Sequence, residues 1–168
     1  MSAATQQGHR NQTRIVADPA MPTITITREF DAPVANVFRA FSEPDLLAQW
    51  LGPRGTTMQI DHYDLRTGGA WRYRAGGGAG DGDVSFYGSF HEVRPEERIV
   101  QTFTFSGYPD GVSLETMTFE DLGDGRARLT GLSVVESLES RDAIIASGME
   151  GGVVEGYERL DELLERIG

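Results

Sequence analysis

Two ionisable residues in the middle of this sequence have a spacing that could support acid–base chemistry. His62 and Asp64 lie two residues apart in a segment with the composition of a strand. Side chains two apart on a strand share a face, so the carboxylate could hold the histidine as a general base. No nucleophile is evident nearby in the sequence, and a solvated outer strand face is the simpler interpretation. His91 and Glu92 are sequence neighbours, so on a strand they would point to opposite faces and form no such pair.

A second candidate pair combines Arg28 with Glu92. Arg28 continues the alternation of Ile24 and Ile26, which would place its side chain on the same face as theirs. Glu92 shares a predicted strand face with Phe90, so it would be a carboxylate in apolar surroundings. An arginine and a glutamate at one end of an apolar cavity could orient the polar group of a ligand. The alternative is a structural ion pair at the rim of the core.

The composition disfavours several other kinds of site. The chain has no cysteine, which excludes disulfides, thiol catalysis and thiolate metal sites. Metal-binding spacings such as HxH and HExxH are missing, and "GDGD" lacks the spaced oxygen ligands of a calcium loop. The stretch "GGGAG" lacks the Lys-Ser/Thr ending of a phosphate-binding loop and precedes a predicted strand, so a flexible hairpin loop is expected there. We therefore expect no metal and no cofactor.

The net charge of the chain is −11, from 15 basic and 26 acidic side chains. Such a chain would repel phosphate backbones and anionic lipid headgroups, so neither nucleic acid nor a membrane surface is an expected partner. No apolar run is long enough to span a bilayer, and the first residues lack the apolar stretch of a signal peptide. Together with the lack of cysteine, these features lead us to expect a cytoplasmic protein.

Hydrophobic periodicity predicts a single α+β domain over residues 22–168. Residues 1–21 are expected to form a flexible leader. Within this leader, "RIVADP" could dock as a short edge segment of the sheet. Two short helices are expected after the first strand, each with apolar residues three and four positions apart. Period two predicts a curved, seven-stranded antiparallel sheet made of residues 23–30, 56–65, 69–75, 84–93, 98–105, 114–121 and 127–135.

The C-terminal segment from Ser140 to Gly168 predicts a long helix. Ser140 could cap its start, and apolar residues recur every three or four positions. Four glycines, at 148, 151, 152 and 156, weaken this helix by roughly 1 kcal/mol each relative to alanine. One long, bent helix is the preferred interpretation, and a break near "SGMEGG" with a second helix after it is the alternative.

Two adjacent glycines, Gly68 and Gly69, precede the strand that carries Trp71 and Tyr73 on one face. Glycine at a bulge lets an antiparallel sheet coil, so we expect the sheet to bend here into a half-barrel. The C-terminal helix across the concave side would then enclose a space. An ordinary filled core would show the same pattern. The face toward the helix is predicted to carry Trp71, Tyr73, Phe103, Phe105, Met117 and Phe119.

Several longer motifs bear a family resemblance: "REFDAP", "WLGPRG", "DLRTGGAWRY", "PEERIVQTF", "ETMTFEDLGDG" and "SRDAIIASGMEGG". From about Thr23 onward the chain resembles the activator of heat-shock protein 90 ATPase homologue-like branch of the SRPBCC/START superfamily, also called birch-pollen-allergen-like. The resemblance implies a helix-grip fold with an internal cavity between the sheet and the C-terminal helix. The residues expected to line that cavity are Arg28, Trp71, Tyr73, Phe90, Glu92, Phe103, Phe105, Met117, Phe119, Gly131, Met149, Val153 and Tyr157.

The sequence departs from the family pattern at two of these positions. Many members carry a tryptophan where Val153 stands, and many carry an aliphatic residue where Gly131 stands. If both positions face inward, each change removes volume and enlarges the cavity, unless neighbouring side chains fill the gap. The namesake activator has an additional N-terminal domain for which this chain has no room, so co-chaperone activity is not expected to carry over.

The leading functional hypothesis is the binding of a small, mostly hydrophobic molecule in this cavity, in a stress-response role. A cyclase- or hydrolase-type enzyme is the first alternative, and it requires two titratable groups to converge inside the cavity. Since no catalytic constellation is evident, a non-enzymatic function is favoured. A chaperone-interacting protein is the second alternative. The chain could also form a homodimer, because an antiparallel sheet exposes edges and a face that a second copy could cover.

Overall fold

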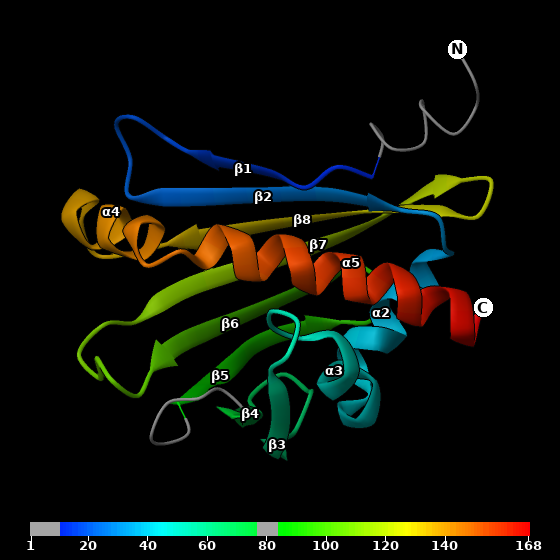
Figure 1. Ribbon diagram of the computed structural model, residues 1–168, viewed down its shortest axis with the longest axis horizontal. Coiled ribbons are helices and arrows are strands. Elements are labelled where there is room, and N and C mark those ends of the chain that lie inside the picture. Colours follow the sequence, from blue (N-terminus) through cyan, green and yellow to red (C-terminus); the bar gives the residue numbers. More distant parts are fainter. Residues whose placement is uncertain (1–10, 77–83) are drawn as a thin grey trace.

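The computed structural model describes residues 11–76 and 84–168 of the chain (Figure 1). The first part of the predicted leader, residues 1–10, and most of the glycine-rich stretch predicted to be a hairpin loop, residues 77–83, lie outside the described residues. Those two predictions therefore stay untested. Within the described residues, no helix is long and apolar enough to cross a membrane.

Within the described residues, eight strands form one antiparallel sheet in the order β1-β2-β8-β7-β6-β5-β4-β3. The α+β class, the antiparallel sheet and the C-terminal helix are confirmed, and the expected number of seven strands was wrong by one. The strands are β1 (Arg14–Ala17), β2 (Thr23–Phe30), β3 (Thr57–Tyr63), β4 (Ala70–Gly76), β5 (Val84–Arg94), β6 (Arg98–Phe105), β7 (Ser113–Gly123) and β8 (Arg126–Val134).

The additional strand is β1, which lies inside the predicted leader. It confirms the suggestion that part of "RIVADP" docks as a short edge segment. It pairs with β2 from Arg14 opposite Thr27 to Ala17 opposite Ile24. β2 would otherwise be the edge of the sheet, with a row of unpaired backbone groups that readily pair with another strand. The short segment "RIVA" therefore gains backbone hydrogen bonds that its composition alone does not reveal.

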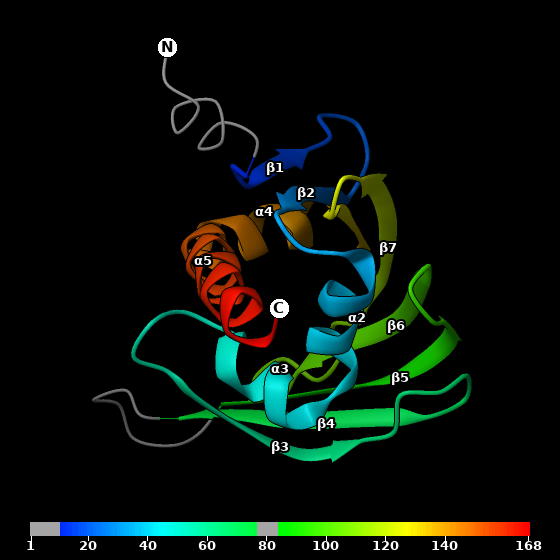
Figure 2. The same ribbon diagram turned by 90° about the vertical axis from the view of Figure 1, so that its right-hand side faces the viewer.

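The sheet curves around the helices, so that its two edge strands lie at opposite ends of an arc (Figure 2). The expected bulge at Gly68 and Gly69 is confirmed, although both residues precede the first residue of β4. The N–H of Gly68 donates to the carbonyl of Phe90, and the N–H of Phe90 donates to the carbonyl of Gly69, so two residues lie opposite one residue of β5. Gly68 has a φ of 86°, a conformation that glycine adopts at little cost. The ladder is also interrupted within β3, β5 and β7, between Ile60 and His62, Phe90 and Glu92, and Asp121 and Gly123.

The helices occupy the concave side of the sheet (Figures 1 and 2). Two short helices follow β2 as predicted: α2 (Val34–Ser42), and α3 (Pro44–Trp50), which begins with its proline. The C-terminal segment forms two helices, α4 (Leu138–Ala146) and α5 (Met149–Ile167), so the preference for one bent helix was wrong. Gly148 separates them with a φ of 87°, which a helix interior does not allow.

The start of α4 is also one turn earlier than expected. Its N-cap is Ser137, whose side chain accepts a hydrogen bond from the N–H of Ser140. Arg141 is buried in α4 and donates to the backbone carbonyls of Asp18, Met21 and Thr23. This arginine therefore ties α4 to the connection between β1 and β2.

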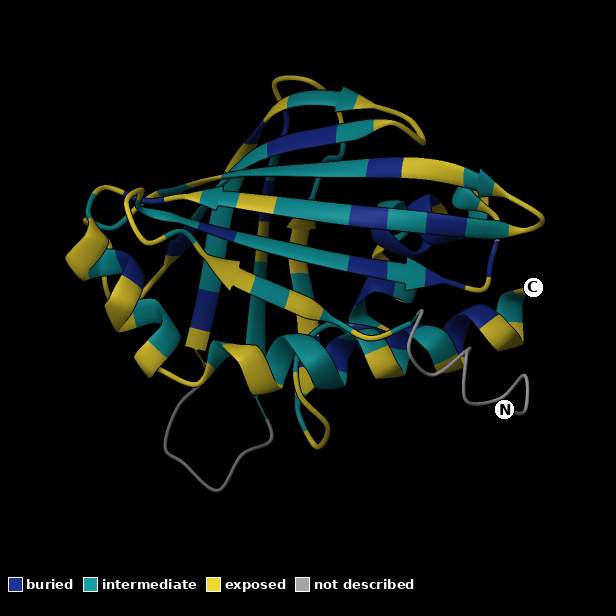
Figure 3. Ribbon diagram, turned by 90° about the horizontal axis from the view of Figure 1, so that it is seen from above, coloured by how far each residue is buried: buried dark blue, intermediate teal, exposed yellow. Residues whose placement is uncertain are grey.

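One end of the molecule has a tightly packed core, which we call the packed end. Its aromatic rings meet edge to face: Phe119 contacts Phe38 at 5.3 Å and Phe41 at 5.4 Å between ring centroids. Three leucines of α5 lie in the same core, at positions 160, 163 and 164, and are at most 5% exposed. Along the strands, buried residues alternate with exposed ones (Figure 3). The packed end holds α5 against α2, α3 and the sheet.

Candidate functional site

Aromatic side chains from β4, β5 and β6 form a continuous surface on the concave side, which we call the aromatic wall. Trp71 stacks on Tyr73 with ring centroids 4.8 Å apart and lies 5.5 Å from Phe103. Phe86 contacts Tyr73 at 5.6 Å, Phe103 at 5.4 Å and Phe105 at 5.5 Å. Four members of this wall were expected from the sequence, and Phe86 joins them because it shares their strand face.

Exposure divides the predicted aromatic and apolar cavity residues into three groups. Trp71, Phe90 and Phe119 are at most 5% exposed and belong to the packed core. Phe105 is 40% exposed and lies at the end of the aromatic wall. The remaining residues have an intermediate exposure. They are Tyr73, Phe103 and Met117 on the concave side of the sheet, where α5 lies, and Met149, Val153 and Tyr157 of α5 itself.

A polar row crosses the concave face beside this half-buried group. The strand registers place Gln101 of β6 opposite Glu115 of β7, and Glu115 opposite Ser133 of β8. Gln101 Nε2 donates to Glu115 Oε2 at 3.2 Å, and Ser133 Oγ donates to Glu115 Oε1 over a longer 3.5 Å. A carboxylate therefore lies among the apolar residues of the inner face, between Met117 on its own strand and the aromatic wall.

Burial raises the pKa of the Glu115 carboxyl to about 7, and the hydrogen bonds from Gln101 and Ser133 oppose that rise. Since no ion pair to Glu115 forms among residues 11–76 and 84–168, a positive side chain does not offset the cost of burying its charge. Glu115 is thus a carboxyl group that changes its charge near neutral pH inside the fold.

Two tyrosines face this carboxyl group from different elements. Burial raises the pKa of Tyr73 on β4 and of Tyr157 on α5, and the charge of Glu115 raises both further. Within the described part of the chain, neither tyrosine hydroxyl has a hydrogen-bond partner in the protein. Both hydroxyls are therefore free to bind a ligand or water.

Gly131 lies on β8 opposite Met117, one position along the strand face from Ser133. A Cβ atom built on Gly131 would meet only the carbonyl oxygen of Ile26, at 3.9 Å, which is an ordinary contact. The missing side chain at this position therefore leaves room on the inner face. Met149 and Val153 of α5 are half-buried, and their helical spacing places them on the same helix face as Tyr157.

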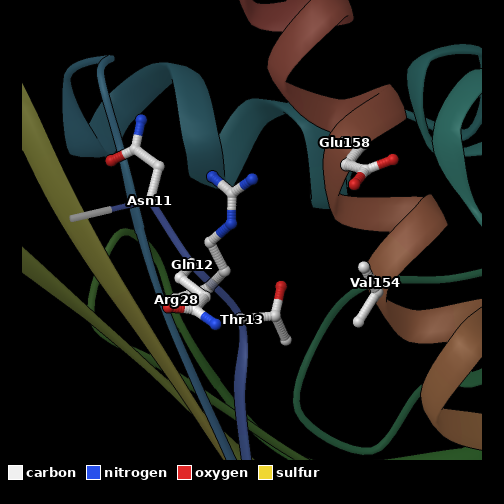
Figure 4. A pocket seen from close by; sticks show the side chains of 6 residues that line it. All are labelled: Asn11, Gln12, Thr13, Arg28, Val154 and Glu158. Carbon is white, nitrogen blue, oxygen red and sulfur yellow. The ribbon is translucent and has the colours of Figure 1, made fainter. Parts of the chain in front are cut away.

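Arg28 does not contact Glu92, as had been hypothesised. Its guanidinium binds the Asp161 carboxylate of α5 through two hydrogen bonds, of 2.8 and 2.5 Å, and its side chain is only 4% exposed. Arg28 also lines a polar groove of about 280 Å³ between α5 and the start of β1, together with Asn11, Gln12, Thr13, Val154 and Glu158. Figure 4 shows the Arg28 side chain reaching toward α5 between Asn11 and Glu158.

Glu92 lies outside the inner face because β5 contains a bulge between Phe90 and Glu92. One extra residue reverses which side chains point inward. As a result Val93 packs against the core, whereas Glu92 forms ion pairs with Arg94 at 2.9 Å and Arg98 at 3.7 Å. The prediction that Glu92 lines the cavity was therefore wrong.

His62 and Asp64 do not form a catalytic pair either. His62 is exposed, and the Asp64 carboxylate binds Arg66 at 2.8 Å. Among the described residues, no group of three or more histidines and carboxylates is arranged to hold a metal ion. The sequence analysis missed Glu115, although the alternation in "LETMTFED" places it on the same strand face as Met117 and Phe119.

Comparison with known proteins agrees with this architecture. The family model for activator of Hsp90 ATPase homolog 1-like proteins matches residues 31–165. No functionally curated protein matches the chain.

Three solved bacterial structures illustrate the similarity of the fold. Protein Ms6760 from Mycobacterium smegmatis has a TM-score of 0.81 at 25% identity, covering 91% of this chain and 97% of that one. A protein from Arthrobacter aurescens has a TM-score of 0.83 at 26% identity, covering 91% of each chain. Protein CV1439 from Chromobacterium violaceum has a TM-score of 0.72 at 30% identity, covering 86% of this chain and 97% of that one.

The curved antiparallel sheet, the helix on its concave side and the family match over most of the chain lead to one conclusion. The chain belongs to the family of activator of Hsp90 ATPase homolog 1-like proteins, a branch of the SRPBCC superfamily.

Proposed function

We propose that this protein binds a small, mostly hydrophobic molecule between the aromatic wall and α5. One observation carries the proposal. Inward-facing apolar side chains, among them Phe103 and Met117, keep surface that water can reach, although α5 lies on their side of the sheet. A filled core would bury such side chains as completely as the packed end buries Phe119.

The lining has the composition of a ligand site. Most of the surface is aromatic or aliphatic, and a few polar groups (Glu115 and the hydroxyls of Tyr73 and Tyr157) face the same region. Apolar walls with a few convergent polar groups are typical of sites that bind small organic molecules. The space at Gly131 extends this region along β8.

The alternatives receive less support. The enzyme hypothesis required two titratable groups to converge inside the cavity. The residues that motivated it, Arg28, Glu92 and the pair His62 and Asp64, have separate ion-pair partners and do not converge. The family name refers to activation of an Hsp90 ATPase, and for this chain a chaperone partner stays a prediction. A cytoplasmic location, a stress-response role, a homodimer and the exclusion of nucleic acid and membranes stay predictions in the same way.

Gly131→Ile is expected to weaken ligand binding without harming the fold. Isoleucine is favoured in strands, so the free energy of unfolding should rise by about 0.5–1 kcal/mol. Its side chain would occupy the space beside Met117, so the affinity for a hydrophobic probe such as phenylbutanol should fall by about tenfold or more. Isothermal titration calorimetry and urea unfolding of both proteins measure the two effects.

Leu132→Ile is the matched control, because Leu132 is the next residue of β8 and is 39% exposed on the opposite face. Its affinity for phenylbutanol should equal that of the wild type. If the wild type bound no hydrophobic probe, or if Gly131→Ile bound one as tightly as the wild type does, the proposed site would be wrong.

A further inference from the structure

Resting on the proposed function, we propose that the ligand carries a protonated amine, which binds the Glu115 carboxylate while its hydrocarbon part lies against the aromatic wall. The ligand class is therefore an aryl- or alkylammonium ion. The proposal depends on the hydrogen-bonding capacity, the charge and the surroundings of Glu115.

The carboxylate of Glu115 has unused capacity as a hydrogen-bond acceptor, and the hydroxyls of Tyr73 and Tyr157 that face it can accept as well as donate. A carboxylate has about four acceptor positions, and here it receives one hydrogen bond of 3.2 Å from Gln101 and one of 3.5 Å from Ser133. The side-chain amide of Gln101 points its NH2 group at Glu115. In this orientation the side-chain oxygen of Gln101 is a further acceptor near the site. A ligand group that donates several hydrogen bonds matches this arrangement, and an ammonium group donates up to three.

The charge around Glu115 favours a cationic ligand. Among the residues that the structure describes, no arginine or histidine forms an ion pair with this carboxylate. The buried guanidinium on the same side of the sheet, that of Arg28, is already bound to Asp161. A buried carboxylate is stabilised by a partner of opposite charge, and a cationic ligand would supply it. A ligand carboxylate would instead be repelled.

The surroundings of Glu115 suit an organic cation. Tyr73 belongs to the aromatic wall, and Tyr157 packs its ring edge to face on Phe30, with 5.6 Å between centroids. Aromatic faces attract ammonium groups and also accommodate hydrocarbon. The net charge of −11 further attracts cations to the protein as a whole.

The proposal also determines how the affinity depends on pH. The carboxyl of Glu115 has a pKa of about 7 in the free protein, so ammonium binding should strengthen as the pH rises through neutrality. The affinity should then stay constant until the amine itself loses its proton, near pH 10 for an alkylamine. The titratable groups that interact with Glu115 are Tyr73 and Tyr157. Tyr63 acts in turn on Tyr73, and Arg28, which is bound to Asp161, acts on Tyr157. Burial raises the pKa of each of these tyrosines, so none should ionise in the neutral range.

The test compares three probes of one shape: phenylbutylamine, phenylbutanol and phenylbutyrate. Calorimetry at about pH 8 should give an affinity for the amine about tenfold above that for the alcohol, with the carboxylate weakest. The ratio of amine to alcohol affinity should fall as the pH is lowered to about 5.5, because Glu115 is then neutral. This pH series uses the wild-type protein and so does not depend on the folding of any variant.

Glu115→Gln should lower the affinity for the amine about tenfold more than that for the alcohol, and should remove the dependence on pH. Glu120→Gln is the matched control, because Glu120 is an exposed residue of the same strand that pairs with Arg128. It should bind all three probes like the wild type.

The outcomes separate this inference from the proposed function. If amine and alcohol bound equally at every pH, or if Glu115→Gln weakened both to the same extent, the ammonium assignment would be overturned while the hydrophobic site would stand. If none of the three probes bound to the wild-type protein, both would be overturned. If phenylbutyrate bound most tightly, the ligand class would be an acid and the assignment would again be wrong.

Discussion

Asp161→Ala should lower the free energy of unfolding by about 3 kcal/mol, because it leaves a buried guanidinium without its partner. The Arg28 side chain is 4% exposed and its guanidinium carbon lies 4.8 Å from the centre of the Phe30 ring. Without Asp161, the partners that Arg28 keeps among the described residues are the backbone carbonyl of Glu29 and the ring of Phe30. Urea unfolding followed by circular dichroism measures the loss through a lower midpoint.

The neighbouring residue of α5 supplies the control for this prediction. Glu162 also binds an arginine, since it accepts a hydrogen bond of 2.6 Å from Arg54, but both side chains are about half exposed. Solvent screens such a pair, so Glu162→Ala should leave the unfolding midpoint nearly unchanged. If both variants lost the same free energy of unfolding, the burial of Arg28 would not determine the strength of its ion pair.

Gly88→Ala should destabilise the protein by about 3 kcal/mol, because β5 and β6 leave no room for a side chain there. A Cβ atom on Gly88 would lie 1.9 Å from the carbonyl oxygen of Thr102 and 2.8 Å from Nε1 of Trp71. The strands would have to separate, and the aromatic wall would be disturbed with them. The free energy of unfolding from urea titration measures the cost.

Gly131→Ala is the matched control for Gly88→Ala, because both glycines lie inside strands of one sheet. The new Cβ atom would be 3.9 Å from its nearest neighbour, so this variant should be as stable as the wild type or gain about 0.5 kcal/mol. A stable Gly88→Ala protein would mean that β5 and β6 lie farther apart than described here.

Most of the overall fold could be predicted from the sequence, because the hydrophobic patterns of strands and helices are local and recur along each element. Period two along each strand and the three- and four-residue spacing of the helices identified α2, α3, the C-terminal helix and seven of the eight strands. β1 was harder to recognise, since it consists of four residues and its stability comes from pairing with β2. The break at Gly148 was also ambiguous, because a glycine can either remain in a helix or end it, and the chain around it decides.

The candidate site was only partly predictable, because one bulge changes the face of every later residue in a strand. Simple alternation placed Glu92 inside, and the bulge after Phe90 places it in an exposed ion pair. The same alternation holds without interruption from Glu115 to Phe119, so the half-buried carboxylate of Glu115 could have been found there. The partners of Arg28 and Glu115 lie on other elements. The packing of α5 brings Asp161 to Arg28, and the register of β6 and β7 brings Gln101 to Glu115.

Crystals of the wild-type protein grown with bromophenylbutanol would show whether a small hydrophobic molecule enters the space between the sheet and α5. The anomalous signal of bromine locates the ligand without a prior assumption. We expect a bromine peak on the concave side of the sheet, among Tyr73, Met117 and Tyr157. If crystals saturated with this ligand showed no bromine on the concave side, or bromine only in the polar groove beside Arg28, the proposed site would be wrong.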